Sequence, residues 1–347
     1  MKQTISIAQR KLFFRLNKMI NKNGIVQHCK LDKPNFEHPA SIDDVARTAI
    51  IYARENNFKN NGNMKILFNY LKQAKRKDGF VNNYRKWGGQ FIKDKKENIQ
   101  DCFGRYLWAL SEIASSEYSE KKEAKELFLD SVHTAYGLNY PMSKALAIIG
   151  LSKFPEKNHC PSHKIMQINN HLNYELLKDF KENSDENWKG FSNKYTYCAS
   201  RPAQAMILAG DKLKHKELIN IGKKSLDFLI KNTIKNNQFN AIGNKGFFKK
   251  GKKIPSYDQQ LIEAGVMIET LIDAYNLTGE KKYLNNAKIC FSWFHKNNIN
   301  NSEMVTDNGG VYDGITRAGI NLNQGAESII SYMLALSKFK EINVNPF

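Results

Sequence analysis

Apolar residues recur at intervals of three and four positions in segment after segment of this chain, and convincing alternating strands are absent. A period near 3.6 residues is typical of amphipathic helices. Clusters of Gly, Pro and Asn separate the periodic segments and mark helix ends. The pattern predicts twelve helices, over residues 5–22, 41–57, 61–76, 99–115, 119–137, 141–153, 162–183, 200–210, 214–233, 257–277, 280–297 and 323–339.

The predicted helices alternate between two kinds. The odd-numbered ones carry one apolar stripe and a lysine-rich opposite face, as in SEKKEAKELFLDSVHTAY at 119–136. The even-numbered ones have small or apolar residues around most of their circumference, as in NQGAESIISYMLALS at 323–337. A helix that is apolar on both sides is buried on both sides, and small residues allow helices to pack closely.

Six outer–inner pairs of this kind predict an all-α fold, a closed α/α six-hairpin toroid with two concentric rings of helices. We expect one domain over residues 1–347. The main alternative, an open helical solenoid, would show a fixed repeat period. The spacing here is uneven, which favours the closed ring.

Unusual polar motifs cluster where the inner helices begin. They read HPASIDDVAR, NIQDCFGRYLW, LNYPMSK, KYTYCASRPAQ, PSYDQQLIEA and GINLNQGAES. The loops that lead into these helices are rich in Gly and aromatic residues, whereas loops that leave them, such as LAGDKLKH, are short and plain. Because the inner helices of an alternating toroid run parallel, we expect one end of the barrel to hold a concave site.

Carboxylates, amides and aromatic rings around a concave site suit a carbohydrate, which offers hydroxyls and apolar ring faces. The candidates for stacking on sugar rings are Trp87, Trp188, Phe191, Tyr195, Tyr257 and Tyr312. The candidates for polar contacts with the substrate are His28, His38, Arg47, Arg105, Tyr197, Arg201, Gln259, Gln260, Glu263, Asn323 and Gln324. The three arginines either bind an acidic sugar or pair with neighbouring carboxylates, and we favour the pairing.

Cleavage of a glycosidic bond needs two carboxyl groups, one to donate a proton and one to act as base or nucleophile. The candidate catalytic residues are Asp43, Asp44, Asp258, Asp313 and Glu327. Asp43 and Asp44 project about 100° apart on a helix, which leaves room for one to face the cavity and the other to cap the helix.

Position along the helices suggests different roles for these carboxyls. The helix dipole should lower the pKa of aspartates in a first turn, which suits a base or nucleophile. Glu327 lies deeper and between small residues, so we expect burial to raise its pKa and make it the better proton donor. Helix capping is the structural alternative for the helical aspartates, and turn formation is the alternative for Asp313 in GGVYDGIT.

Charge and composition narrow the class of protein. The chain has 347 residues, is 41% hydrophobic and carries a net charge of +19, so nucleic acid, anionic lipid and acidic polysaccharide are possible partners. Most lysines are spread along the outer helix faces and no nucleic-acid-binding signature accompanies them, so we expect no nucleic-acid partner. The charged N-terminus and the lack of 18 consecutive apolar residues predict a cytoplasmic protein without a membrane span.

Cysteine and histidine spacing gives no sign of a metal site. Five cysteines are scattered without a CxxC pair, so we expect free buried thiols and no disulfide framework. The histidines form no HxxxH pair with a carboxylate. We therefore expect neither a metal nor a cofactor.

Five longer motifs cover much of the chain: PNFEHPASIDDVARTAI, DCFGRYLWALSEIA, YTYCASRPAQAMILAG, SYDQQLIEAGVMIETLIDAYNLTGEKKYLNNAKICFSWF and GGVYDGITRAGINLNQGAESIISYMLAL. They resemble a bacterial family of six-hairpin-glycosidase-like domains, found alone or fused C-terminal to glycosyltransferases. The resemblance runs from about residue 24 to residue 338. It implies the α/α toroid and a carbohydrate substrate, which we expect to be an oligosaccharide or glycoconjugate. The fusion makes a glycosyltransferase a possible partner.

The chain keeps most of the motif residues of that family. It has the aspartate pair followed by Arg47, the Tyr-Asp-Gln-Gln run at 257–260, the Tyr-Asp-Gly loop at 312–314 and the run at 323–328. It departs at Cys198 and Ala199. The family motif there resembles TYDNAR, with an aspartate and an asparagine at these two positions. Three hypotheses follow: a glycoside-hydrolase-type enzyme, which we favour, a non-catalytic glycan-binding partner of a glycosyltransferase, and a sugar epimerase that uses His28 and His38.

Overall fold

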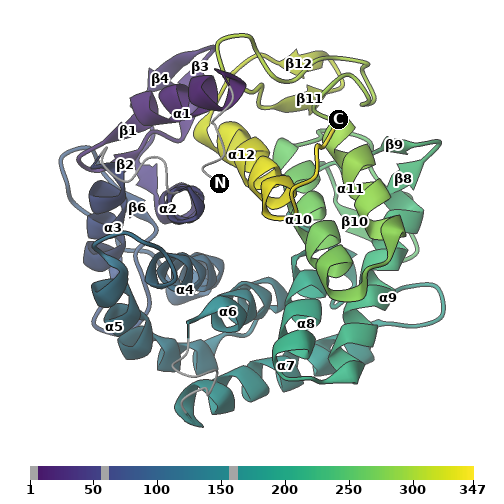
Figure 1. Ribbon diagram of the computed structural model, residues 1–347, viewed down its shortest axis with the longest axis horizontal. Helices are drawn as coiled ribbons and strands as arrows, with labels where there is room; N and C mark the ends of the chain where they lie inside the picture. Colours follow the sequence, from purple (N-terminus) through teal and green to yellow (C-terminus); the bar gives the residue numbers. More distant parts are fainter. Residues whose placement is uncertain (1–6, 56–61, 156–162) are drawn as a thin grey trace.

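The computed structural model describes residues 7–55, 62–155 and 163–347 (Figure 1). The helices in these residues are α1 Ile7–Met19, α2 Ile42–Arg54, α3 Asn63–Ala74, α4 Gln100–Ala114, α5 Lys121–Ser131, α6 Pro141–Lys153, α7 His163–Asn183, α8 Arg201–Lys212, α9 Lys216–Thr233, α10 Leu261–Thr278, α11 Lys281–Ser292 and α12 Ala326–Glu341. Short 3-10 helices span Lys96–Asn98 and Val132–Gly137.

The even-numbered helices form an inner ring and the odd-numbered helices surround it (Figure 1). Each inner helix packs on the next, and α12 returns to contact α2. Each outer helix packs mainly on one inner helix, α3 on α2 and α5 on α4 for example, and α1 covers α12. The predicted all-α toroid of six hairpins is therefore confirmed.

Glycines bring inner helices close together, as the small residues predicted. A Cβ atom added at Gly104 of α4 would lie 2.7 Å from Leu146 Cβ and 2.9 Å from the carbonyl oxygen of Ser143, both on α6. A Cβ at Gly150 of α6 would lie 2.8 Å from the backbone nitrogen of Trp108. The close approach of α4 and α6 therefore requires glycine, which has no Cβ atom, at these two positions.

The loops contain short antiparallel ribbons that pair β1 with β2, β3 with β4, β5 with β6, β7 with β10, β8 with β9 and β11 with β12. The strands are β1 Ile20–Asn21, β2 Gly24–Ile25, β3 His28–Lys30, β4 Lys33–Asn35, β5 Ala40–Ser41, β6 Tyr84–Arg85, β7 Lys194–Tyr195, β8 Ile234–Lys235, β9 Gln238–Phe239, β10 Phe248–Lys249, β11 Gly314–Thr316 and β12 Gly319–Asn321. They are too short to show alternation in the sequence. Each of these strands lies in a loop that leads from an outer helix to an inner one, so the elaborate loops are at the end that the motifs indicated.

Two inner helices begin three or four residues later than predicted. The predicted starts were 257 for α10 and 323 for α12, whereas these helices begin at Leu261 and Ala326. Tertiary hydrogen bonds hold the preceding residues in extended conformations. Gln259 exchanges two 2.9 Å backbone bonds with Ile315, and Gln324 N donates to the carbonyl of Leu31.

Within the described residues, the free thiols are all buried, and Cys160 lies outside those residues. None of the described helices has both the length and the apolar character needed to cross a membrane. The same part of the chain holds no group of three or more His, Cys, Asp and Glu side chains that could hold a metal ion.

Candidate functional site

A cavity of about 700 Å³ opens where α2 and α12 begin, and we call it the main cavity. Its wall combines the loop before α2, the first turns of α2 and α12, and the ribbon of β11 and β12. It brings together nine of the residues predicted from the sequence: His28, His38, Asp43, Asp44, Arg47, Gln260, Asp313, Asn323 and Glu327.

Arg47 holds two of the predicted carboxylates. Its Nη2 lies 2.8 Å from Asp44 Oδ1 and 2.9 Å from Glu327 Oε2. These two oxygens are therefore no more than 5.7 Å apart, the limit set by the two distances to one nitrogen. The predicted preference of this arginine for carboxylate pairing is confirmed.

Asp44 is buried at the start of α2. Ser41 is the N-cap residue, since its Oγ accepts a hydrogen bond from Asp44 N, and the same hydroxyl donates to Asp44 Oδ2. Burial raises the pKa of Asp44 to about 6, although the charge of Arg47 opposes the shift. The prediction of a lowered pKa for this aspartate was wrong, because desolvation outweighs the charge of Arg47.

The arrangement in which one aspartate faces the cavity and the other caps the helix is not found. Ser41 caps the helix, so neither aspartate supplies the cap, and both line the main cavity. Asp43 is the more exposed of the two and pairs with Arg105 Nη1 at 3.1 Å.

Glu327 is not buried as the sequence suggested, since 41% of its side chain is exposed. The physical reason is the late start of α12. With Gly325 at the N-cap, Glu327 belongs to the first turn of the helix and faces the cavity instead of lying a turn deeper.

Asp313 contacts the start of α12 and is more enclosed than Glu327. Its Oδ1 accepts hydrogen bonds from Gly325 N at 2.7 Å and from Ser328 Oγ at 2.6 Å. Burial raises its pKa, and the negative charge of Glu327 acts in the same direction. The aspartate thus joins its glycine-rich loop to α12, which is more than the local turn that was its structural alternative.

His28 and His38 form an edge-to-face pair in the wall of the main cavity, with ring centroids 4.8 Å apart. Burial and the neighbouring His38 lower the pKa of His28, while the charges of Asp313 and Glu327 oppose the shift. His28 therefore favours its neutral form more than an exposed histidine does.

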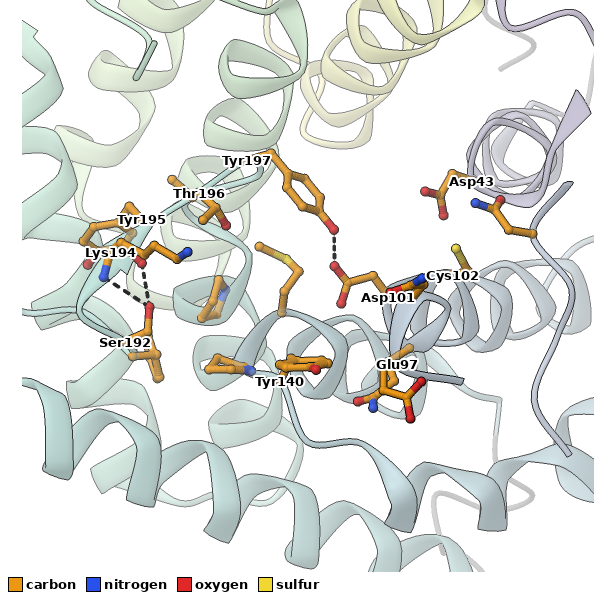
Figure 2. A pocket seen from close by; sticks show the side chains of 18 residues that line it. Asp43, Glu97, Asp101, Cys102, Tyr140, Ser192, Lys194, Tyr195, Thr196 and Tyr197 are labelled. Carbon is orange, nitrogen blue, oxygen red and sulfur yellow. Dashed lines mark hydrogen bonds between the residues drawn. The ribbon is translucent and has the colours of Figure 1, made fainter. Parts of the chain in front are cut away.

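A second cavity of about 390 Å³ adjoins the main cavity, and Figure 2 shows the side chains that line it. The two cavities share Asp43 and Asn83 as wall residues. Tyr197 and Asp101 point toward one another in Figure 2, and the tyrosine hydroxyl donates to the aspartate. Of the predicted residues, this cavity contains Asp43, Phe191, Tyr195 and Tyr197.

Sequence reasoning missed Asp101, Tyr140 and Met142, which line the second cavity. The motifs NIQDCFGRYLW and LNYPMSK contain all three. Their position at the starts of α4 and α6 was the available signal, because every inner helix begins at the same end of the ring.

The other predicted residues lie outside the walls of both cavities. They are Trp87, Arg105, Trp188, Arg201, Tyr257, Asp258, Gln259, Glu263, Tyr312 and Gln324. Trp188 is a core residue rather than a stacking platform, because it is 2% exposed and packs on Tyr195, Phe228 and Phe248. Asp258 lies before α10, where Lys245 Nζ approaches its Oδ2 at 3.4 Å.

Several of these residues support the site from behind. Glu263 is buried and accepts hydrogen bonds from the backbone nitrogens of Cys198, at 2.5 Å, and Ala199, at 3.2 Å. Burial raises the pKa of Glu263 to about 7. Gln259 is also buried, and its Oε1 accepts from Trp293 Nε1 at 2.9 Å.

The arginines behind the cavities are paired with carboxylates as predicted. Arg105 pairs with Asp43, and Arg201 Nη2 lies 2.6 Å from Glu269 Oε1 inside the ring.

Trp87 lies beside the main cavity. Its Nε1 donates to the carbonyl of His38, and its ring packs on Phe36.

No family model and no curated protein sequence matches the chain. Solved structures of sugar-processing enzymes share its fold. A sugar epimerase from a ruminal bacterium is 12% identical, with a TM-score of 0.73 over 97% of this chain and 98% of that one. A D-mannose isomerase is 11% identical, with a TM-score of 0.71 over 96% of each chain. A family 76 α-1,6-mannanase from Salegentibacter is 9% identical, with a TM-score of 0.64 over 96% of this chain and 98% of that one. At these identities the likeness shows the α/α toroid fold alone.

Proposed function

We propose that this protein is a glycoside-hydrolase-type enzyme that cleaves an oligosaccharide or glycoconjugate in the main cavity. One observation carries the proposal: Asp313 and Glu327 are neighbours with opposite environments. Asp313 is enclosed and its pKa is raised, which suits a proton donor. Glu327 is exposed in the cavity and ion-paired with Arg47, which suits a base or nucleophile.

This assignment reverses the role that the sequence suggested for Glu327. A proton donor benefits from burial, and burial belongs to Asp313 instead. Asp44 then acts through Arg47, whose guanidinium it orients toward Glu327. Asp43 is a substrate-orienting residue at the boundary between the two cavities.

A sugar substrate is supported by two independent features. The wall of the main cavity supplies carboxylates, amides and imidazoles, which are hydrogen-bond partners for sugar hydroxyls. The solved structures with this fold include a mannanase, a sugar epimerase and a mannose isomerase.

A second candidate function is sugar epimerisation, and the histidine pair favours it. His28 has a lowered pKa, so a neutral imidazole is available near neutral pH to take a proton from a carbon next to a carbonyl. Glu327 and Asp313 lie close enough to influence its charge.

One experiment separates these functions. The purified protein is incubated in D₂O buffer with manno- and gluco-oligosaccharides, and the products are analysed by mass and by NMR. Shorter saccharides are the result expected of the glycosidase. Unshortened sugars that have gained carbon-bound deuterium would replace this proposal with the epimerase. Binding without either change would favour a non-catalytic glycan-binding protein.

A further inference from the structure

We propose that the second cavity binds a second sugar ring, so that the substrate is a neutral oligosaccharide whose chain crosses Asp43. This inference rests on the proposed function, because it assigns the neighbouring rings of one substrate to two adjoining cavities. It adds a binding site made of residues from α4, α6 and the loop before α8.

The two cavities lie side by side, and the residues between them are held in place. Asp43 and Asn83 belong to both linings. Asp43 Oδ1 is held by Arg105 at 3.1 Å. Asn83 is buried, its Oδ1 accepts from Ile42 N at 3.3 Å, and its carbonyl accepts from the Tyr70 hydroxyl at 2.7 Å. One ligand in both cavities would therefore pass beside Asp43 and Asn83.

The second cavity has the two kinds of surface that a sugar ring needs. Tyr140, which is 48% exposed, lies in its wall beside Pro141 and Met142 at the start of α6. Such apolar and aromatic surface suits the C–H face of a pyranose. Asp101, in the first turn of α4, supplies a carboxylate that can accept hydrogen bonds from hydroxyls.

The polar side of this cavity is pre-organised. The Tyr197 hydroxyl donates to Asp101, and the Arg105 guanidinium lies 5.5 Å from the centroid of the Tyr197 ring. Arg105 also holds Asp43, so one arginine orders groups on both sides of the boundary between the cavities. The volume of about 390 Å³ is within the range of small-molecule sites, roughly 300–1,000 Å³.

The charge of the walls argues for a neutral sugar. Seven acidic side chains line the two cavities: Glu37, Asp43, Asp44, Glu97, Asp101, Asp313 and Glu327. Three basic side chains line them: Lys30, Arg47 and Lys194. This acidic balance contrasts with the net charge of +19 for the whole chain, so a uronic acid or a phosphosugar would meet repulsion where a neutral hexose would not.

The test measures binding rather than turnover. Titration calorimetry compares glucose, mannose and their disaccharides and trisaccharides, in an Asp313→Asn background that keeps the acceptor for Gly325 and Ser328. We expect a disaccharide of one series to bind at least about tenfold tighter than its monosaccharide. Tyr140→Ala should weaken the disaccharide by about three- to tenfold and leave the monosaccharide unchanged.

A second variant and a matched control sharpen the result. Met142→Trp should fill the second cavity and abolish the gain from the second ring, while Tyr174→Ala, an exposed tyrosine of α7, should change neither affinity. Equal loss of monosaccharide and disaccharide affinity in Tyr140→Ala would overturn the second ring site. A uronic-acid disaccharide that binds as tightly as the neutral one would overturn the neutral-substrate assignment. If no saccharide binds, the proposed function fails together with this inference.

Discussion

Arg47 Nη2 lies 2.9 Å from Glu327 Oε2, and this ion pair joins the first inner helix, α2, to the last, α12. The two residues are 280 positions apart in the chain. The same contact thus links the two ends of the inner ring and holds the exposed carboxylate of the main cavity.

Replacement of Arg47 by Met should destabilise the fold by about 3–5 kcal/mol at pH 8, because it leaves the buried Asp44 carboxylate without its partner. The pKa of Asp44 is about 6 with Arg47 present. Below that pH the carboxyl is increasingly neutral and needs no cation, so the loss should shrink at pH 5. Urea denaturation at the two pH values measures both effects.

The matched control for that substitution is Lys30→Met, in another cavity-lining ion pair. The side chains of Lys30 and Glu37 are 69% and 66% exposed, so solvent screens their pair and it should contribute little to stability. A loss in Lys30→Met equal to that in Arg47→Met would contradict the importance given to burial.

Asp313→Asn and Glu327→Gln should each lower kcat by about 10²- to 10⁴-fold, the range for loss of an acid–base group. The asparagine keeps an oxygen for Gly325 and Ser328, so the melting temperature of Asp313→Asn should stay close to that of the parent. Steady-state hydrolysis of the oligosaccharide found active and circular dichroism provide the two measurements.

Asp258→Asn is the control for the carboxyl assignment. Asp258 was a catalytic candidate in the sequence but lies outside both cavity walls. Its substitution should leave kcat within a few-fold of the parent. Activity that disappears in Asp258→Asn and survives in Glu327→Gln would refute the assignment.

Glu263 predicts how stability varies with pH. Its pKa is about 7 in the fold against 4.5 for an ordinary glutamate. The folded protein therefore binds the proton more tightly than the unfolded chain, and this group lowers stability as the pH rises from about 4.5 to 7. Glu263→Gln removes that dependence, which unfolding free energies measured between pH 4 and 8 would reveal.

The same substitution carries a separate cost. A glutamine offers one oxygen to the two backbone N–H groups of Cys198 and Ala199, so one of them loses its acceptor at a cost of about 1–3 kcal/mol. The deficit relative to the parent should be largest near pH 4 and should narrow by pH 8. A deficit that grows with pH would show that Glu263 is not destabilising when charged.

Gly104→Ala tests the close contact of α4 with α6. The added methyl would meet Leu146 Cβ at 2.7 Å, and such overpacking costs about 1–3 kcal/mol, more than the 0.5–1 kcal/mol that alanine gains in a helix. Gly88→Ala is the control, because nothing lies within 4 Å of its added Cβ. Thermal unfolding should show a lower melting temperature for the first variant alone.

Helix periodicity was sufficient to predict the ring. Residues 141–153 were predicted as a helix and are helical over the same range, because the apolar pattern and Pro141 at the first turn both act locally. The positions of the polar motifs also indicated which end of the barrel carries the main cavity. Nine predicted residues meet there, from loops and helices as distant as His28 and Glu327.

Errors arose where distant segments impose a conformation or an environment. The stretch before α10 looked helical, yet Gln259 is paired with Ile315 of β11. Glu327 was expected to be buried and is exposed, whereas Asp44 was expected to have a lowered pKa and has a raised one. The second cavity was missed because its walls come from three separate helix starts whose side chains have no shared motif.

The sequence by itself determined the twelve helices, their sorting into two rings and the end of the barrel at which polar residues gather. These features follow from hydrophobic periodicity and from chain breaks, which are properties of neighbouring residues. Only the tertiary structure decided which carboxyl is buried, which is exposed and which arginine holds them. The ionisation of a side chain depends on its exposure to water and on charges within a few ångströms. In this fold, residues from opposite ends of the chain set both the exposure and the nearby charges.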